Sequence, residues 1–305
     1  MERSSHKLAA AITWAASKQT YLTIRFLVDR ERVSDAFGAY AYFRWLDDEL
    51  DRDGIQPAER LALVARQQGL MDALYHAQPV PTDLAPQERL LEELVRGDHE
   101  KNSGLQCYIR NMMAVMVFDA RRRNRSISAR ELSDYANSLA LAVTEAMHYF
   151  IGHGDAAPVG RVRYLAVTAA HITHMLRDTL EDVPAGYFNV PGEFLAGHKL
   201  AAADVESPAY RGWVQERVRL ARAYFKAGRA NLAQVPSLRC RLAGYAYTAR
   251  FESVLDAIER DGYRLRASYP ECKCVHVGAQ MLLWAFWQAL ASMRPALAVR
   301  RLPES

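Results

Sequence analysis

Hydrophobic residues recur every three or four positions along most of the chain, the spacing that places them on one face of an α-helix. The pattern predicts helices over residues 9–26, 34–50, 58–75, 86–97, 129–151, 159–183, 210–233, 237–260 and 277–293. No stretch alternates hydrophobic and polar residues for long enough to predict a β-sheet. The chain is therefore predicted to be all-α.

The breaks between these segments are short and carry residues typical of turns. Asp53-Gly54 is expected to lie just beyond one helix, and residues 152–158 are expected to form a loop. Another helix is expected to end at Val183, because the residue before a proline disfavours the helical conformation. No linker rich in Pro, Gly or Ser divides the chain. We therefore predict one domain over residues 1–305, although the length alone suggests two.

Composition narrows the classes of protein that fit. Hydrophobic residues make up 50% of the chain and charged residues 24%, which is typical of a globular protein rather than a disordered one. The formal net charge is only +4, so no nucleic-acid partner is expected. The arginines within residues 121–125 are interpreted as a solvated helix end, with a nucleic-acid or lipid patch as the alternative.

The N-terminal residues show no secretory signal, so the four cysteines are expected to be reduced thiols in a cytoplasmic protein. Cys272, Cys274 and His276 form a C-x-C-x-H cluster, either a site for a soft metal or a loop before a helix. Residues 275–293 contain no Asp, Glu, Lys or Arg and approach the length of a membrane span. Polar residues interrupt this run, which favours a buried or membrane-surface helix instead.

Two of the predicted helices carry stripes of acidic residues. In the first, Tyr40, Arg44, Asp47 and Asp51 lie at offsets of 0, 4, 7 and 11 residues, with Asp48 and Glu49 beside them. Such offsets place the four side chains on one face, over about 16 Å of helix.

The second stripe has almost the same spacing. His171, His174, Asp178 and Asp182 lie at offsets of 0, 3, 7 and 11 residues, flanked by Arg177 and Glu181. Apolar neighbours predict that both helices are mostly buried, where like charges are costly unless a cation compensates them.

Paired carboxylates therefore predict a site for hard cations. If the two stripes face each other, they would hold Mg²⁺, which takes one or two carboxylates and completes its shell with water and phosphate oxygens. Arg44 and Arg177 are placed to clamp the same phosphates. Metal and diphosphate inside an apolar bundle point to ionisation of an allylic diphosphate. The alternative is a solvated acidic helix end with local Arg pairs.

These segments resemble the squalene/phytoene synthase family. Residues 40–51, YAYFRWLDDELD, are similar to its first Asp-rich motif, and residues 171–191, HITHMLRDTLEDVPAGYFNVP, are similar to its second. Residues 118–147 resemble the intervening segment in which an Asp, an Arg run and a Tyr precede a helix of small residues. Residues 249–263 resemble a late helix of the family, so the likeness spans nearly the whole chain.

The resemblance implies a single-domain, all-α isoprenoid synthase bundle around a central cavity, and a transferase that joins two prenyl diphosphates head-to-head. Its cofactor would be Mg²⁺, with Mn²⁺ as a substitute. The implied metal ligands are Asp47, Asp51, Asp178 and Asp182. The implied catalytic residues are Tyr40, Arg44, Tyr135 and Arg177, and the implied substrate-binding residues are Ser17, Lys18, His171, His174 and Phe251.

Several positions depart from the family pattern. His174 stands where the family commonly has Asn, and His171 where it has Gln. A neutral imidazole suits softer ions than Mg²⁺, whereas a protonated one could bind diphosphate directly. Ala16 replaces an early His, while Phe251 and Asn189 each replace a Tyr. We therefore expect a divergent member with an unusual substrate or product.

Other readings remain open at this point. The same scaffold could be a class I terpene cyclase or a partial-reaction enzyme that ionises a single diphosphate, or it could be a non-catalytic scaffold. Glu145 and His148 form one E-x-x-H pair, which keeps a dinuclear-metal oxidase as a further alternative. Candidates for the cavity floor are Phe26, Leu139, Ala140 and Val143. The expected protein is a monomer or homodimer with peripheral membrane contact for product release.

Overall fold

A computed structural model describes residues 2–270 and 286–288, with side chains from residue 5 onward. Helices dominate, and the only β-type pairing in these residues is an isolated bridge between Ile127 and Pro191. This confirms the predicted all-α class. The C-x-C-x-H cluster and the helix predicted over 277–293, apart from residues 286–288, lie outside the described part. Within it, no helix is both long and apolar enough to cross a membrane.

The chain divides into two units. The first comprises residues 1–123 and 141–154, and the second comprises residues 124–140 and 155–305. Helix α7, Ala129–Phe150, contributes its N-terminal part to the second unit and its C-terminal part to the first. The single domain proposed from the sequence stays a prediction.

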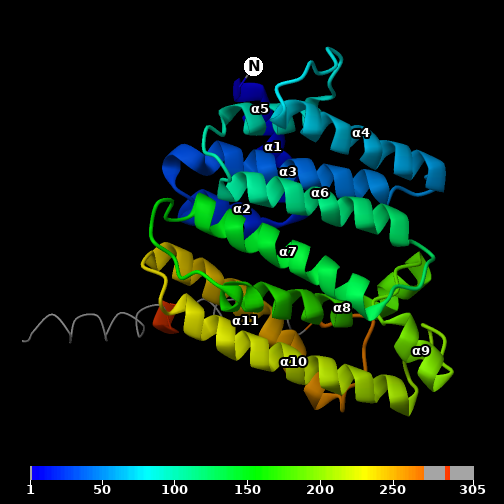
Figure 1. Cartoon of the computed structure of the whole chain (residues 1–305). Helices are drawn as coiled ribbons and strands as arrows, with labels where there is room; N and C mark the ends of the chain where they lie inside the picture. The colour runs from blue at the N-terminus through cyan, green and yellow to red at the C-terminus, as the bar shows by residue number, and fades with distance from the viewer. Residues whose placement is uncertain (1, 271–285, 289–305) are drawn as a thin grey trace, which may run out of the picture. The chain divides into compact units, whose positions relative to one another are not determined.

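The first unit is arranged around helix α3. Its other helices are α1, α2, α4, α5 and α6, which span Glu2–Ala16, Lys18–Leu27, Pro57–Tyr75, Pro86–Gly97 and Gly104–Arg122. Helix α3, Val33–Leu50, packs against α1, α2, α5 and α6, and Figure 1 shows it among them. Phe37, Tyr42 and Leu46 of α3 are almost completely buried. A 3-10 turn, η1, covers Arg30–Arg32.

Ser17 divides the first predicted helix into α1 and α2. Its backbone is extended, with φ of −154°, and its hydroxyl accepts a hydrogen bond from the Thr20 N–H at 3.2 Å. Serine is a favoured N-cap because this contact satisfies an N–H that the helix itself leaves without an acceptor. The prediction of one continuous helix over residues 9–26 was therefore wrong.

The second unit is built on α8, Leu165–Ala185, which packs against α10, Pro208–Leu232, and α11, Leu238–Arg260. Its smaller elements are the turn η2, Arg161–Tyr164, and the helix α9, Gly192–His198. Val214, Phe225 and Leu255 are fully buried in this core. A Cβ added at Gly228 would lie 2.7 Å from the Cβ of Ala166, so this glycine permits the close approach of α10 to the start of α8.

Helix α8 continues past the end that the sequence predicted. It runs through Pro184 to Ala185, because a proline in the last turn sacrifices one backbone hydrogen bond without preventing the helical conformation there. Gly186 has φ of +88° and donates to the Val183 carbonyl at 3.1 Å, while Tyr187 donates to the Asp182 carbonyl at 2.9 Å. This pair of bonds is a Schellman motif.

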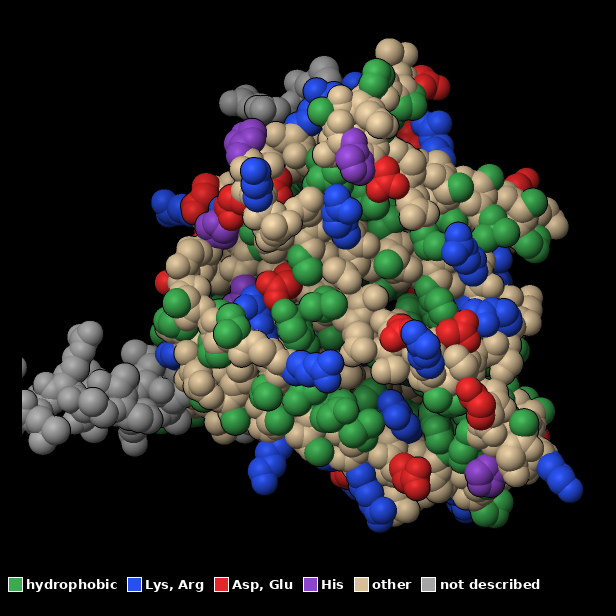
Figure 2. Space-filling model, in the orientation of Figure 1, with side chains coloured by type: hydrophobic (Ala, Val, Ile, Leu, Met, Phe, Trp, Pro, Cys, Tyr) green, Lys and Arg blue, Asp and Glu red, His purple; other side chains and the backbone are tan. Residues whose placement is uncertain are grey.

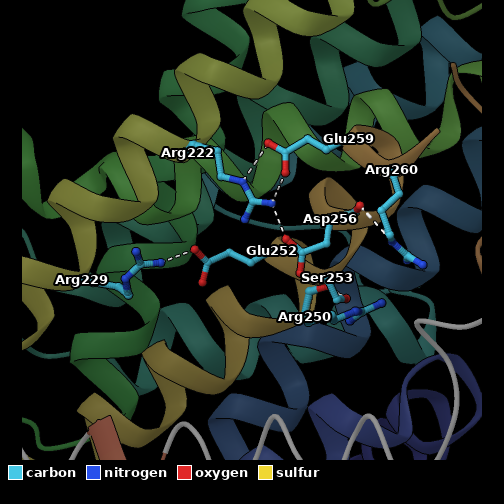
Figure 3. Close-up of polar contacts among 8 residues, drawn as sticks. All are labelled: Arg222, Arg229, Arg250, Glu252, Ser253, Asp256, Glu259 and Arg260. Carbon is cyan, nitrogen blue, oxygen red and sulfur yellow. Dashed lines mark hydrogen bonds and ion pairs between the residues drawn. The ribbon is translucent and has the colours of Figure 1, made fainter. Parts of the chain in front are cut away.

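Ion pairs connect α10 to α11 along one side (Figure 3). Arg222 of α10 donates to Glu259 at 2.7 and 3.2 Å and also pairs with Asp256. Arg229, two turns further along, pairs with Glu252. These contacts hold the middle of α11 against α10, where Phe251 lies.

We expect Arg222→Met to lower the free energy of unfolding by about 0.5–1 kcal/mol, the range for a partly exposed ion pair. Urea unfolding of the full chain measures the change. Arg219→Met is the matched control, because Arg219 is an exposed residue of the same helix. An equal loss in both variants would contradict the assignment.

Candidate active site

The first acidic stripe lies at the C-terminal end of α3. Asp47 is in the last turn, and Asp51 caps the helix by donating its backbone N–H to the Asp47 carbonyl at 3.0 Å. Phe43, Leu46 and Leu50 bury the opposite side of this turn. The Asp47 side chain therefore stays 43% exposed at the edge of a buried helix, where a ligand can reach it.

Arg44 makes its principal contacts with Asp48. Its Nε lies 3.1 Å from Asp48 Oδ2 and its Nη2 also pairs with Asp48, whereas its Nη1 lies 3.4 Å from Asp47 Oδ2. The sequence placed Asp48 only beside the stripe. In the structure this carboxylate holds the guanidinium next to Asp47.

Negative charge accumulates at Asp47. Burial, together with the charges of Asp51, Asp119 and Asp48, raises the pKa of its carboxyl to about 6, although Arg44 acts in the opposite direction. Asp119 lies on α6 and was not among the predicted site residues. Its only signal in the sequence was its position just before the Arg run, in the segment that resembles the family. Asp119 accepts a 2.6 Å hydrogen bond from Arg122.

Ser17, the first residue of the early Ser-Lys pair, lies near Tyr40 of the same unit. The hydroxyls of Ser17 and Thr20 lie within hydrogen-bonding reach of the Tyr40 hydroxyl, and burial raises the pKa of this phenol. Tyr40 is therefore protonated at neutral pH and able to donate. Lys18 is exposed, with its Nζ 5.5 Å from the centre of the Trp14 ring.

The second acidic stripe lies on α8. Asp178 accepts two hydrogen bonds from Arg177, at 2.6 and 2.7 Å, and its Oδ2 lies 3.1 Å from Nε2 of His174. A bidentate contact of this kind shows that the guanidinium is oriented to grip paired oxygens. Arg177, His174 and Asp178 thus form one connected group on the predicted face.

Asp182 is held by a residue that the prediction did not include in the site. The Asn189 side chain donates to Asp182 Oδ2 at 2.7 Å and is itself buried. The Schellman turn at Gly186 reverses the chain and brings Asn189 back to the end of α8. The sequence registered Asn189 only as a departure from the family's Tyr.

His174 is a neutral imidazole at pH 7. Burial lowers its pKa to about 4, and the charges of Arg177 and Arg250 act in the same direction, while Asp178 only partly opposes them. The sequence left open whether this imidazole is neutral or protonated, and the lowered pKa favours the neutral form.

His171 and His174 each lie against an aromatic ring. The buried His171 ring lies edge-on to Tyr135, with 4.9 Å between ring centres. Phe251 of α11 lies 6.4 Å from the His174 ring and 5.2 Å from the Tyr247 ring. Tyr135, His174 and Phe251 are far apart in the sequence but belong to the same unit.

Phe26 was one of the candidates for the cavity floor, and the structure contradicts that assignment. Its side chain is 70% exposed on α2, which is incompatible with a position at the base of a cavity.

The donor set of both stripes suits a hard divalent cation. Each stripe offers two carboxylates, and both burial and the neighbouring carboxylates disfavour the ionised form of Asp47, which a bound cation would stabilise. Within residues 2–270 and 286–288, no group of three or more His, Cys, Asp or Glu side chains is arranged to hold a metal ion. Such an ion would therefore need oxygens from water or substrate.

Comparison with solved structures places the fold. Squalene synthase HpnC from Alicyclobacillus acidocaldarius has a TM-score of 0.67 at 19% identity, over 87% of this chain and 97% of that one. Two structures of TcSQS, each with a ligand, have TM-scores of 0.63 and 0.65 at 15% identity. They cover 94% and 95% of this chain and 92% of each TcSQS chain. The chain therefore shares the all-α isoprenoid synthase fold of these structures.

Sequence comparison identifies the family. No curated protein matches the chain. The family model described as squalene/phytoene synthase matches residues 14–275, which include both acidic stripes and residues of both units. The chain therefore belongs to the squalene/phytoene synthase family of prenyltransferases.

Proposed function

We propose that the protein condenses two molecules of farnesyl or geranylgeranyl diphosphate head-to-head. The reaction would pass through a cyclopropyl diphosphate to a product of the squalene, dehydrosqualene or phytoene type. The observation that carries this proposal is the pairing of aspartates with an arginine on both α3 and α8. Family and fold favour it over a class I terpene cyclase or partial-reaction enzyme.

In this proposal Asp47, Asp51, Asp178 and Asp182 hold Mg²⁺, with Mn²⁺ as a substitute. The bound ion supplies positive charge that stabilises a departing diphosphate. The buried Asn189 side chain keeps Asp182 in place, since its amide donates to one carboxylate oxygen. This arrangement orients the ligand before any ion arrives.

The two arginines bind diphosphate oxygens. Guanidinium groups match paired oxygens, and Arg177 already makes such a bidentate contact with Asp178. Arg44 makes a similar contact with Asp48, so each arginine is held near its aspartate pair until substrate binds. Positive charge at these positions favours the ionised state of the substrate.

Hydroxyl donors complete the site. The protonated Tyr40 donates to the leaving diphosphate, with Ser17 positioning its hydroxyl and Lys18 adding positive charge at the start of α2. Tyr135, whose ring contacts that of His171, is the second tyrosine of the proposed site.

The changed residues of α8 and α11 give this member its own product range. Phe251 provides an aromatic face but no hydroxyl, and it lies beside the neutral His174. A ring face stabilises a carbocation without donating a proton or reacting with it. We infer that these residues alter how the cation is steered.

Asp47→Ala and Asp178→Ala should each reduce diphosphate release by about two orders of magnitude or more, because each removes a metal ligand. Glu49→Ala and Glu181→Ala are matched controls, since both glutamates lie on the same helices beside the stripes. A colorimetric assay of released diphosphate measures the rates. Full activity in either aspartate variant would contradict the metal assignment.

Acid pH should weaken metal activation. As the pH falls through about 6, Asp47 takes up a proton, so the Mg²⁺ concentration for half-maximal rate rises. In metal-free protein the folded pKa of Asp47 is above its unfolded value, so ionisation costs stability as the pH rises. Asp47→Asn should therefore raise the melting temperature above pH 6, where Asp47 is ionised, but leave it unchanged in acid. The same Mg²⁺ requirement on both sides of pH 6 would contradict this role.

Incubation with farnesyl or geranylgeranyl diphosphate and Mg²⁺, followed by mass spectrometry, tests the product. We expect a head-to-head product other than ordinary squalene or phytoene as the main species. His174→Asn with Phe251→Tyr should shift the products toward those two hydrocarbons. If the unaltered protein already makes squalene or phytoene as its dominant product, the proposed divergence is wrong.

A further inference from the structure

We propose that the exposed face of α1 and α2 is a docking surface for an anionic lipid bilayer. This lipid-facing surface consists of Lys7, Trp14, Lys18, Leu22, Arg25 and Phe26. It lies within one unit, shares only Lys18 with the proposed substrate site and uses neither of the aspartate pairs.

Helix α2 carries large apolar side chains on its solvent-exposed side. Lys18, Leu22, Arg25 and Phe26 follow one another at helical spacing on its exposed side, while Ile24 faces the interior. Leu22 is 47% exposed and Phe26 is 70% exposed. Large apolar side chains therefore stand on the solvent side, with a cation within one turn of each.

Trp14 extends this face onto the end of α1. Its side chain is 47% exposed, and its ring centre lies 5.0 Å from that of Tyr21 and 5.5 Å from Lys18 Nζ. Lys7 lies two turns before Trp14 on the exposed side of α1. Tryptophan and lysine side chains together are typical of the interface between water and hydrocarbon, because each has an apolar body and a polar end.

The charge of this region differs from that of the whole chain. Between Glu2 and Asp29 there is no acidic residue, while Arg3, Lys7, Lys18 and Arg25 are basic. Elsewhere the charges are nearly balanced, and Figure 2 shows acidic and basic side chains interspersed over the face it displays. Basic side chains interleaved with exposed apolar ones fit anionic headgroups above hydrocarbon.

A lipid surface fits better than a second copy of the chain. In a symmetric dimer through this face, Lys18 and Arg25 would meet the same cations of the partner. A nucleic acid would pair with the cations but would leave Leu22 and Phe26 without apolar contact. Anionic lipid satisfies both kinds of side chain at once.

Co-sedimentation of the full chain with vesicles tests the proposal. We expect binding to phosphatidylcholine vesicles with about 30% phosphatidylglycerol, and much weaker binding to phosphatidylcholine alone or in high salt. The double variant Leu22→Ser/Phe26→Ser should weaken binding about tenfold or more. Lys7→Gln/Arg25→Gln should weaken it about fivefold for each charge removed.

Leu61→Ser is the matched control, because Leu61 is a 43% exposed leucine on α4 of the same unit. It should bind vesicles as the unaltered chain does, and unchanged melting temperatures would show that the variants fold. The proposal is overturned if the unaltered chain does not bind, or if Leu22→Ser/Phe26→Ser binds normally. It is also overturned if Trp287→Ser alone abolishes binding, or if light scattering shows that Leu22→Ser/Phe26→Ser dissociates a dimer.

Discussion

Repulsion between carboxylates at the end of α3 is the interaction on which the proposed chemistry depends. Asp47 lies close enough to Asp51, Asp119 and Asp48 for their charges to raise its pKa, although Arg44 is beside it. A surface used only for solubility gains nothing from such crowding. A divalent cation would compensate this charge, and the 43% exposed side chain of Asp47 is accessible to one.

The stripe on α8 balances its charge differently. Asp178 is already compensated by the bidentate Arg177 and lies within hydrogen-bonding distance of His174, and Asp182 is held by Asn189. The carboxylates of this stripe are therefore held by neighbouring side chains, and in the proposed function it is the charge at Asp47 that a cation would compensate. The contrast is consistent with a site in which arginine contacts are exchanged for phosphate contacts when substrate binds. On the same stripe, desolvation and the charges of Arg177 and Arg250 lower the pKa of His174.

Periodicity predicted most helices because long amphipathic segments such as α7 and α10 carry a clear apolar face. It missed α6, whose apolar residues cover a wide surface, and α9, which has only seven residues. It also missed the break at Ser17, where a single side-chain cap outweighs a continuous apolar pattern. Within the candidate site, helical spacing predicted the two stripes. Asp119 and Asn189 could not be placed, because both reach the aspartates through tertiary contacts or a chain reversal.

The most direct test of the central claim is calorimetric titration of the protein with inorganic diphosphate, with Mg²⁺ present and with Mg²⁺ removed by a chelator. The claim is that the aspartates repel diphosphate until cations bind to them. We predict saturable binding with Mg²⁺ and little heat of binding without it. Equal affinity in the two conditions would contradict the account, because the arginines alone would then suffice to hold the diphosphate.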